Sequence, residues 1–449
     1  MSRNKSTKNQ SSAIATIFAV SLLAILLPLL NLTPLLDFLL LLLFLTILVL
    51  LINPKWGLFA IILLRPTLDF SSNLTIFEIG PLSINLASLL GLLLIPVVIM
   101  IAAKKKNLLK KIPLLKNWIL FLVVLSLSML ISFNKTASIS ELIRFISIFS
   151  LFILGSITIR NKNDLLQIIL ISIISMVIPS LVALYQLVNN TGLTLSYQDV
   201  PNRLFGTFAH PNLFAFSLTL SIALSLAMFL KNKNTSIKFL YGFAFLSYSG
   251  LLALTYTRGA WILFIFMIIS AGILKLRKLL IISTLIFFCL YLTVGPVKDR
   301  INSITTLSPY SSITWRFNLW RDSFEYIKEA PILGHGTGTS EELIKIRRGS
   351  FLGSTAPHND FLKILLENGI FGIIAFLGIF FVLSKKLFLG FSRNSSSEYS
   401  ILVLIFFCFT IGLYAASFGD NILEATALQW SFWPLAAGFL VSCKPSKQS

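Results

Sequence analysis

The chain has 449 residues, of which 56% are hydrophobic and only 12% are charged. Soluble domains carry about a quarter charged residues, so this composition excludes an ordinary water-soluble globule. The formal net charge of +20 does not indicate nucleic-acid binding, because the lysines gather in short segments between apolar runs, where they orient a membrane protein.

Apolar stretches long enough to cross a bilayer as helices recur along the whole chain. They predict an all-α polytopic membrane protein with about 12–14 transmembrane helices. The first apolar run lacks a convincing cleavage site, so we expect a retained first helix rather than a removed signal peptide. The expected spans are 13–31, 35–52, 57–66, 83–103, 117–133, 140–158, 165–188, 213–230, 239–256, 259–274, 279–295, 361–384, 400–417 and 426–442.

A cytoplasmic N-terminus places every short basic loop on the cytoplasmic side, as the positive-inside rule requires. The chain then divides into transmembrane helices over 1–295, a large extracytoplasmic loop over 296–360 and C-terminal transmembrane helices over 361–449. Both termini are expected in the cytoplasm. The outer side also receives 67–82 and 189–212, so we expect any active site on that side.

Arginines and all three histidines are concentrated on this predicted outer side. The planar arginine fork matches phosphate oxygens, so the outer face is suited to an anion, unless these arginines are merely solvated. Histidine exchanges protons near neutral pH, although a lone histidine is often only a structural hydrogen-bonding residue. The residues are Arg65, Arg144, Arg203, Arg258, Arg300, Arg316, Arg321, Arg347, Arg348, His210, His335 and His358.

His358 directly precedes the span that begins near residue 361. Asn359 or Asp360 can cap that helix, but a cap requires no histidine, so we also expect a function for His358. Glu367 lies about two turns into the span and is expected to face a polar cavity, orient a neighbour or pair with an arginine.

Residues 314–329 predict one amphipathic helix in the outer loop, with Trp320, Phe324 and Ile327 on its apolar face. Arg316 lies one turn before Trp320, near the inward edge of that face, where it would bind an anion or snorkel to the interface. The charged face is expected to carry Asp322, Glu325 and Lys328.

Short glycine-containing segments mark further candidate sites. Arg258 stands beside Gly259 where two spans meet with almost no loop, so it either approaches a ligand or anchors the turn. Segments 203–212 and 331–338 lack the context of a nucleotide fingerprint, and the second is expected to be a compact turn that packs the loop.

No cofactor or metal is expected from the sequence. The cysteines Cys289, Cys408 and Cys443 lie in or at the end of apolar segments, which favours neither disulfides nor a thiolate metal site. The outer face also lacks an Asp/Glu/His cluster at metal-ligand spacing.

The order and spacing of these motifs resemble the O-antigen ligase and O-antigen polymerase superfamily of bacterial membrane glycosyltransferases. Each motif is short, but together they cover roughly residues 200–375. They are Arg203 with Gly206-Thr207-Phe208 and Pro211-Asn212, the Thr257-Arg258-Gly259 corner, Arg316 with Trp320, Pro331 with Gly334, Gly336 and Gly338, and His358-Asn359 with Glu367-Asn368-Gly369.

The resemblance implies a fold like that of type C glycosyltransferases and a glycan donor carried on a polyprenyl pyrophosphate such as undecaprenyl pyrophosphate. It places the enzyme in the bacterial cytoplasmic (inner) membrane, with an extracytoplasmic active site. Arg258 and Arg316 are then expected to bind the donor pyrophosphate, and His358 to activate the acceptor hydroxyl. Thr257 replaces the family's serine, a conservative departure. Possible supporting residues are Arg203, His210, Asn359, Glu367, Trp320 and His335.

Displacement of lipid pyrophosphate predicts a metal-independent, inverting reaction. The expected partners are the lipid-linked donor, a glycan, lipid or protein acceptor, and the bilayer. A ligase that builds lipopolysaccharide or another cell-envelope polymer is the leading interpretation, and a polysaccharide polymerase with the same donor is the alternative. A secondary transporter is less consistent with the sequence, which shows no repeated halves, and a scaffold leaves the outer arginines and histidines unexplained. The candidate charged residues of a transport site lie toward the outer ends of their spans, which suits an outer cavity better; they are Glu141, Arg144, Lys363 and Glu367.

Overall fold

The computed structural model describes residues 34–72, 74–79, 82–194, 202–281, 283, 312–349, 355–393 and 399–442. This part of the chain is almost entirely helical, which confirms the expected all-α polytopic class. It also contains a short hairpin that was not predicted, in which β1 (Phe77–Ile79) pairs with β2 (Leu82–Ile84) in antiparallel register. The expected span 13–31 and nearly all of 279–295 lie outside the described residues.

The helices follow the expected spans closely. Seven candidate spans in the described residues are long and apolar enough to cross a membrane, and three more apolar helices are shorter. The expected single span 165–188 is divided into two helices at Ser175 and Met176. In chain order the helices are α2 (Pro34–Ile52), α3 (Pro54–Leu68), η2 (Asp69–Ser71), α4 (Leu86–Lys104), α5 (Lys106–Leu109), α6 (Leu115–Ile131), α7 (Lys135–Thr158), α8 (Lys162–Ile174), α9 (Val177–Asn189), α10 (Pro211–Lys231), α11 (Thr235–Leu254), α12 (Arg258–Leu274), α15 (Ser312–Glu329), α16 (Ser340–Arg348), α17 (Asp360–Arg393), α18 (Tyr399–Ala416), η3 (Ile422–Glu424) and α19 (Thr426–Ser442).

Asparagine side chains start many of these helices. An asparagine oxygen at this position accepts a backbone N–H that has no partner inside the helix, which stabilises the helix start by about 1 kcal/mol. Sharp starts of this kind allow the connections between neighbouring helices to be short. The capping residues are Asn53, Asn85, Asn134, Asn161 and Asn234.

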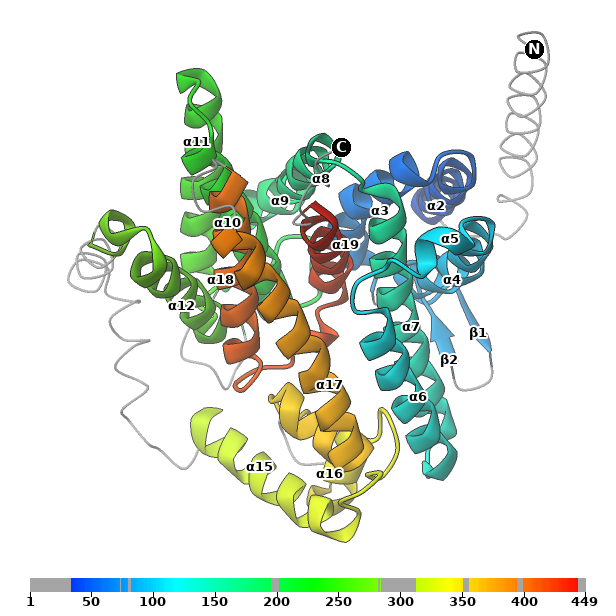
Figure 1. The fold of residues 1–449 in the computed structure, drawn as a ribbon. Coiled ribbons are helices and arrows are strands. Elements are labelled where there is room, and N and C mark those ends of the chain that lie inside the picture. Colours follow the sequence, from blue (N-terminus) through cyan, green and yellow to red (C-terminus); the bar gives the residue numbers. More distant parts are fainter. Residues whose placement is uncertain are drawn as a thin grey trace, which may run out of the picture.

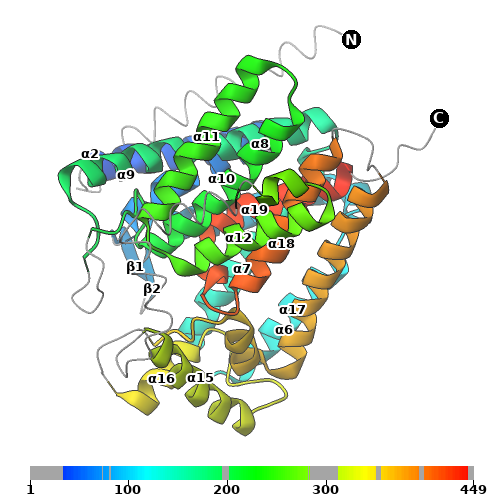
Figure 2. The same cartoon turned by 90° about the vertical axis from the view of Figure 1, so that its left-hand side faces the viewer.

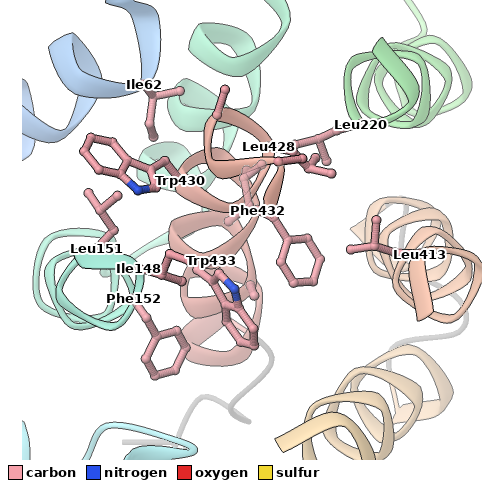
Figure 3. Packing of buried hydrophobic residues seen from close by; sticks show 14 of the residues in the cluster. Ile62, Ile148, Leu151, Phe152, Leu220, Leu413, Leu428, Trp430, Phe432 and Trp433 are labelled. Atoms are coloured by element: carbon pink, nitrogen blue, oxygen red, sulfur yellow. The ribbon is translucent and has the colours of Figure 1, made fainter. Parts of the chain in front are cut away.

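Helix α19 lies in the core of the bundle, packed against α3, α7, α8, α10 and α17. Trp433 packs on Phe152 of α7 with ring centroids 5.9 Å apart, and Phe432 lies on the side of α18 (Figure 3). A Cβ at Gly155 of α7 would lie 2.7 Å from Cα of Pro434, so the two helices approach too closely for any side chain there. This packing fixes the start of α19 and the connection that precedes it.

Helices α15 and α16 lie together at one end of the bundle, next to α6 and α17 (Figures 1 and 2). The expected helix 314–329 is confirmed, but its predicted faces were partly wrong. Phe324 is 51% exposed, whereas Asp322 is buried, as are Leu319 and Ser323. Asp322 is buried because Arg348 of α16 donates a hydrogen bond to its carboxylate, a contact between helices that the periodicity of α15 cannot indicate.

Helix α17 is broken at Gly369, where the expected span 361–384 was continuous. Gly369 has φ +59°, and a Cβ there would lie 2.2 Å from the carbonyl oxygen of Ile332. The backbone groups released by the break bond to segment 331–338, with Gly336 N donating to Glu367 O at 3.0 Å and Ile370 N donating to Pro331 O at 2.9 Å. The expected compact turn is therefore confirmed, and it is built onto the broken helix.

Candidate functional site

Asp420, in the connection between α18 and α19, joins three distant segments of the chain. Its Oδ2 accepts a hydrogen bond from Nδ2 of Asn212 at 3.2 Å, and its Oδ1 lies 3.5 Å from Nδ1 of His358. The Arg316 guanidinium lies 3.9 Å from Oδ2. The carboxylate thus brings the start of α10, the loop before α17 and helix α15 to one point.

The charge on Asp420 is set by two opposing effects. Burial raises the pKa of the carboxyl group, but the contact with His358 and the positive charge of Arg316 outweigh burial, so the net pKa lies below its ordinary value. Asp420 is therefore an ionised carboxylate at neutral pH, facing an imidazole nitrogen.

His358 is held in an unusual backbone conformation directly before α17. Its φ is +49°, in the left-handed region, and its side chain is 21% exposed. The carbonyl before it, on Pro357, accepts a hydrogen bond from Nε1 of Trp320 at 2.8 Å. The residue after it, Asn359, caps α17 by accepting from Leu362 N at 3.0 Å. The capping function therefore belongs to Asn359, and the His358 side chain takes no part in it.

Arg316 points inward from α15, as its spacing from Trp320 indicated. One guanidinium nitrogen donates to the carbonyl oxygen of Gly419, and another faces Asp420. The Arg316 side chain is 30% exposed, so it is not fully enclosed by these partners.

Arg203 is a structural residue of the corner that carries Arg258. Its side chain is 3% exposed and donates to Thr255 O at 2.9 Å, to Thr257 Oγ1 at 3.1 Å and to Asn212 Oδ1 at 3.0 Å. These bonds fix the turn between α11 and α12, so the expected supporting role of Arg203 consists of holding this corner.

Arg258 is the first residue of α12, and Gly259 beside it approaches Asp420. A Cβ on Gly259 would lie 3.3 Å from Oδ2 of Asp420, which places the start of α12 against the carboxylate. The N-termini of α10, α12 and α17 therefore meet around Asp420. Helix N-termini carry partial positive charge, so their convergence favours negative charge at this point, beginning with the Asp420 carboxylate.

Part of the chain matches a known protein family. Residues 242–377 match the family model described as O-antigen ligase. This part of the chain is an O-antigen ligase family domain. No curated protein matches the chain. The match supports an O-antigen ligase-like function in a multi-pass membrane protein, with a lipid-linked glycan as the substrate class.

The O-antigen ligase domain contains only part of the site. Arg258, Arg316 and His358 fall within 242–377, whereas His210 precedes the matched residues and Asp420 follows them. The complete arrangement therefore forms only when α10 and the connection between α18 and α19 pack against the O-antigen ligase domain.

His210 lies at the start of α10, where its Nδ1 accepts a hydrogen bond from Asn212 N at 3.1 Å. Burial, reinforced by the charge of Arg203, lowers the pKa of His210 to about 4, although the charge of Asp420 acts in the opposite direction. The imidazole is therefore neutral at physiological pH.

The side chains of Glu367 and His335 form hydrogen bonds with residues of α15 and of the segment between α15 and α17, and not with Asp420. Glu367 accepts from Gly338 N at 2.8 Å and from Ser340 Oγ at 2.7 Å, and His335 Nε2 lies 2.7 Å from the carbonyl oxygen of Tyr326. Glu367 thus orients the glycine turn. Among the described residues Glu367 forms an ion pair with Lys363 and not with the expected arginine.

Lys363 is the centre of a buried ion cluster next to this turn. Its Nζ lies 2.8 Å from Glu424, 3.5 Å from Glu141 and 3.8 Å from Glu367. These carboxylates come from the connection before α19, from α7 and from α17 itself. Lys363 therefore holds the connection that carries Asp420 against the helix that begins after His358.

Several arginines expected on the outer face already have internal partners. Arg65 bonds to Asp69 and Thr426, Arg144 to Glu141 and Leu423 O, and the neighbours Arg347 and Arg348 both pair with Asp322. Arg300 lies outside the described residues. Of the two residues expected to bind the pyrophosphate, Arg316 faces Asp420, and Arg258 begins α12 next to Gly259, which approaches that carboxylate.

Sequence reasoning missed Asp420. The available signal was a lone aspartate in a short connection between two apolar spans, on the same side as the long loop. This connection lies outside the motifs that carry the family resemblance, so Asp420 was not predicted as a site residue. Among the described residues, no three His, Cys, Asp or Glu side chains are grouped so that they could hold a metal ion.

Proposed function

We propose that this protein transfers a glycan from a polyprenyl-pyrophosphate carrier to an acceptor hydroxyl at the outer face of the bacterial cytoplasmic membrane. The observation that supports this most directly is the position of Asp420, which contacts both His358 and Arg316. The Asp420 carboxylate thereby holds His358, the proposed proton acceptor, near Arg316, the proposed anion-binding group.

In the proposed reaction His358 is the general base. Asp420 faces Nδ1 and leaves Nε2 to accept the proton of the acceptor hydroxyl, which is how a carboxylate orients an imidazole in other enzymes. The acceptor oxygen bonds to the anomeric carbon as the bond from that carbon to the pyrophosphate oxygen breaks. Direct displacement of this kind inverts the anomeric configuration.

The leaving group is a lipid pyrophosphate whose negative charge increases as the bond breaks. Arg258 and Arg316, together with the helix N-termini around Asp420, would stabilise that charge without a divalent cation. We therefore expect transfer to continue in EDTA and the product to have the inverted configuration. Inhibition by EDTA that magnesium reverses, or a product of retained configuration, would contradict this mechanism.

The function can be tested in a strain from which the gene is deleted. Wild-type protein should restore mature surface glycan and remove accumulated polyprenyl-linked glycan, whereas His358→Ala, Arg258→Ala and Arg316→Ala should not. Arg321→Ala is the matched control, because Arg321 lies on the same helix as Arg316 but is exposed. Full restoration by all three variants at matched membrane abundance would overturn the proposal.

The stalled species identifies the acceptor class. Accumulation of complete polyprenyl-linked chains together with unmodified acceptor indicates a ligase, which is the activity we propose. Accumulation of single polyprenyl-linked repeat units indicates a polymerase that uses the same donor, and that result would replace the ligase assignment.

A further inference from the structure

His210 carries a hydrogen-bond donor whose position is fixed by the fold. Its Nδ1 accepts the backbone N–H of Asn212 at 3.1 Å, so the lone pair of Nδ1 is occupied and Nδ1 carries no proton. In the neutral imidazole the single proton therefore resides on Nε2. The capping bond at the start of α10 thus fixes the tautomer of His210.

The start of α10, which carries His210, lies next to Asp420. Asn212, on the same turn, bonds to Arg203 through its oxygen and to Asp420 through its nitrogen. The His210 imidazole also interacts electrostatically with His358 and Asp420. Among the described residues, no hydrogen bond joins Nε2 of His210 to a protein acceptor. His210 is only partly buried, so a ligand can reach this donor.

We propose that Nε2–H of His210 donates a hydrogen bond to an uncharged hydroxyl oxygen of the acceptor glycan, next to the hydroxyl that His358 deprotonates. This inference rests on the proposed function and adds a binding group for the acceptor. His210 is then a substrate-binding residue, and it remains a donor while His358 gains and loses its proton.

The charge state of His210 favours a hydroxyl over a phosphate. Its imidazole is neutral at physiological pH, so it adds no positive charge that would hold a phosphate. The arginines assigned to the pyrophosphate are Arg258 and Arg316. A neutral donor next to the general base is better suited to a sugar hydroxyl, which both gives and accepts hydrogen bonds.

Two substitutions separate the donor from the helix cap. His210→Asn places an amide oxygen near the position of Nδ1, so it keeps the cap and removes the donor at Nε2. His210→Gln extends an amide nitrogen toward the position of Nε2, so it keeps the donor and loses a good cap. A purely structural histidine and an acceptor-binding histidine therefore predict opposite rankings of these variants.

The assay mixes each purified variant with membranes from the deletion strain, which contain the stalled lipid-linked glycan and the unmodified acceptor. We expect His210→Asn to lower the initial transfer rate by about tenfold, as for a lost hydrogen bond, with an unchanged Tm. His210→Gln should transfer faster than His210→Asn in spite of a lower Tm.

The ranking of the two variants decides the inference. Wild-type transfer by His210→Asn, or transfer by both variants that falls only in proportion to Tm, would overturn the role of His210. His358→Ala in the same assay tests the proposed function separately. If His358→Ala is inactive while His210→Asn is fully active, the proposed function stands and only the acceptor contact is lost.

Discussion

Nδ1 of His358 lies 3.5 Å from Oδ1 of Asp420, although the helices α17 and α18 separate the two residues in the sequence. The carboxylate is buried and ionised, so it favours the imidazole orientation in which the other ring nitrogen faces the ligand. It also stabilises the positive charge that His358 would carry after accepting a proton.

Replacing Asp420 by asparagine should therefore impair transfer more than it impairs folding. The amide has the size of the carboxylate but no charge, so we expect initial rates to fall by about 100-fold, within the range of general base catalysis. Transfer is measured with deletion-strain membranes, and Glu325→Gln on the exposed side of α15 is the control. Unchanged rates for Asp420→Asn at equal abundance would remove Asp420 from the mechanism.

Lys363→Met should destabilise the protein strongly, because three carboxylates would lose their shared cation. Breaking a buried ion pair typically costs about 3–5 kcal/mol. Thermal unfolding in detergent measures the effect, with Lys328→Met, which breaks an exposed pair with Glu325, as the control. Adding Glu424→Gln should recover part of the loss, and a Tm for Lys363→Met equal to that of the control would contradict the assigned role.

Gly369→Ala should prevent normal accumulation of the protein. The alanine Cβ would lie 2.2 Å from the Ile332 carbonyl oxygen, at a φ of +59° that side chains rarely adopt. Gly250→Ala in α11 is the matched control, since its Cβ would meet nothing within 4 Å. Membrane abundance and Tm report the difference, and equal values for the two variants would show that the break in α17 is not required.

Acid should destabilise the wild-type protein through His210. Its pKa falls from 6.5 to about 4 on folding, so between these values the unfolded chain binds more protons than the folded protein. The contribution of His210 to stability is complete above pH 6.5 and is lost as the pH falls to about 4. His210→Asn should therefore show a smaller decrease in Tm over this interval, and parallel Tm curves would contradict the shifted pKa.

Local patterns in the sequence predicted much of this protein. Hydrophobic runs fixed the membrane class and most helix bounds, because the length and composition needed to cross a bilayer are properties of a single segment. The periodicity of 314–329 likewise predicted α15, and the position of His358 immediately before a helix was visible in the chain.

What depended on contacts between distant segments was not visible. Asp322 was placed on an exposed face because its partner Arg348 belongs to another helix, and the bonds by which Arg203 holds the α11–α12 corner could not be derived from its own segment. The reason in both cases is that a charged side chain has the same local pattern whether a protein group or a ligand balances it.

The sequence by itself determined that this is a helical membrane protein, since hydropathy is a property of each segment of the chain. Only the tertiary structure decided that Asp420 completes the arrangement of His358 and Arg316. The physical reason is that a buried carboxylate is stabilised by the groups packed around it, and those groups come from α10, α15 and the loop before α17.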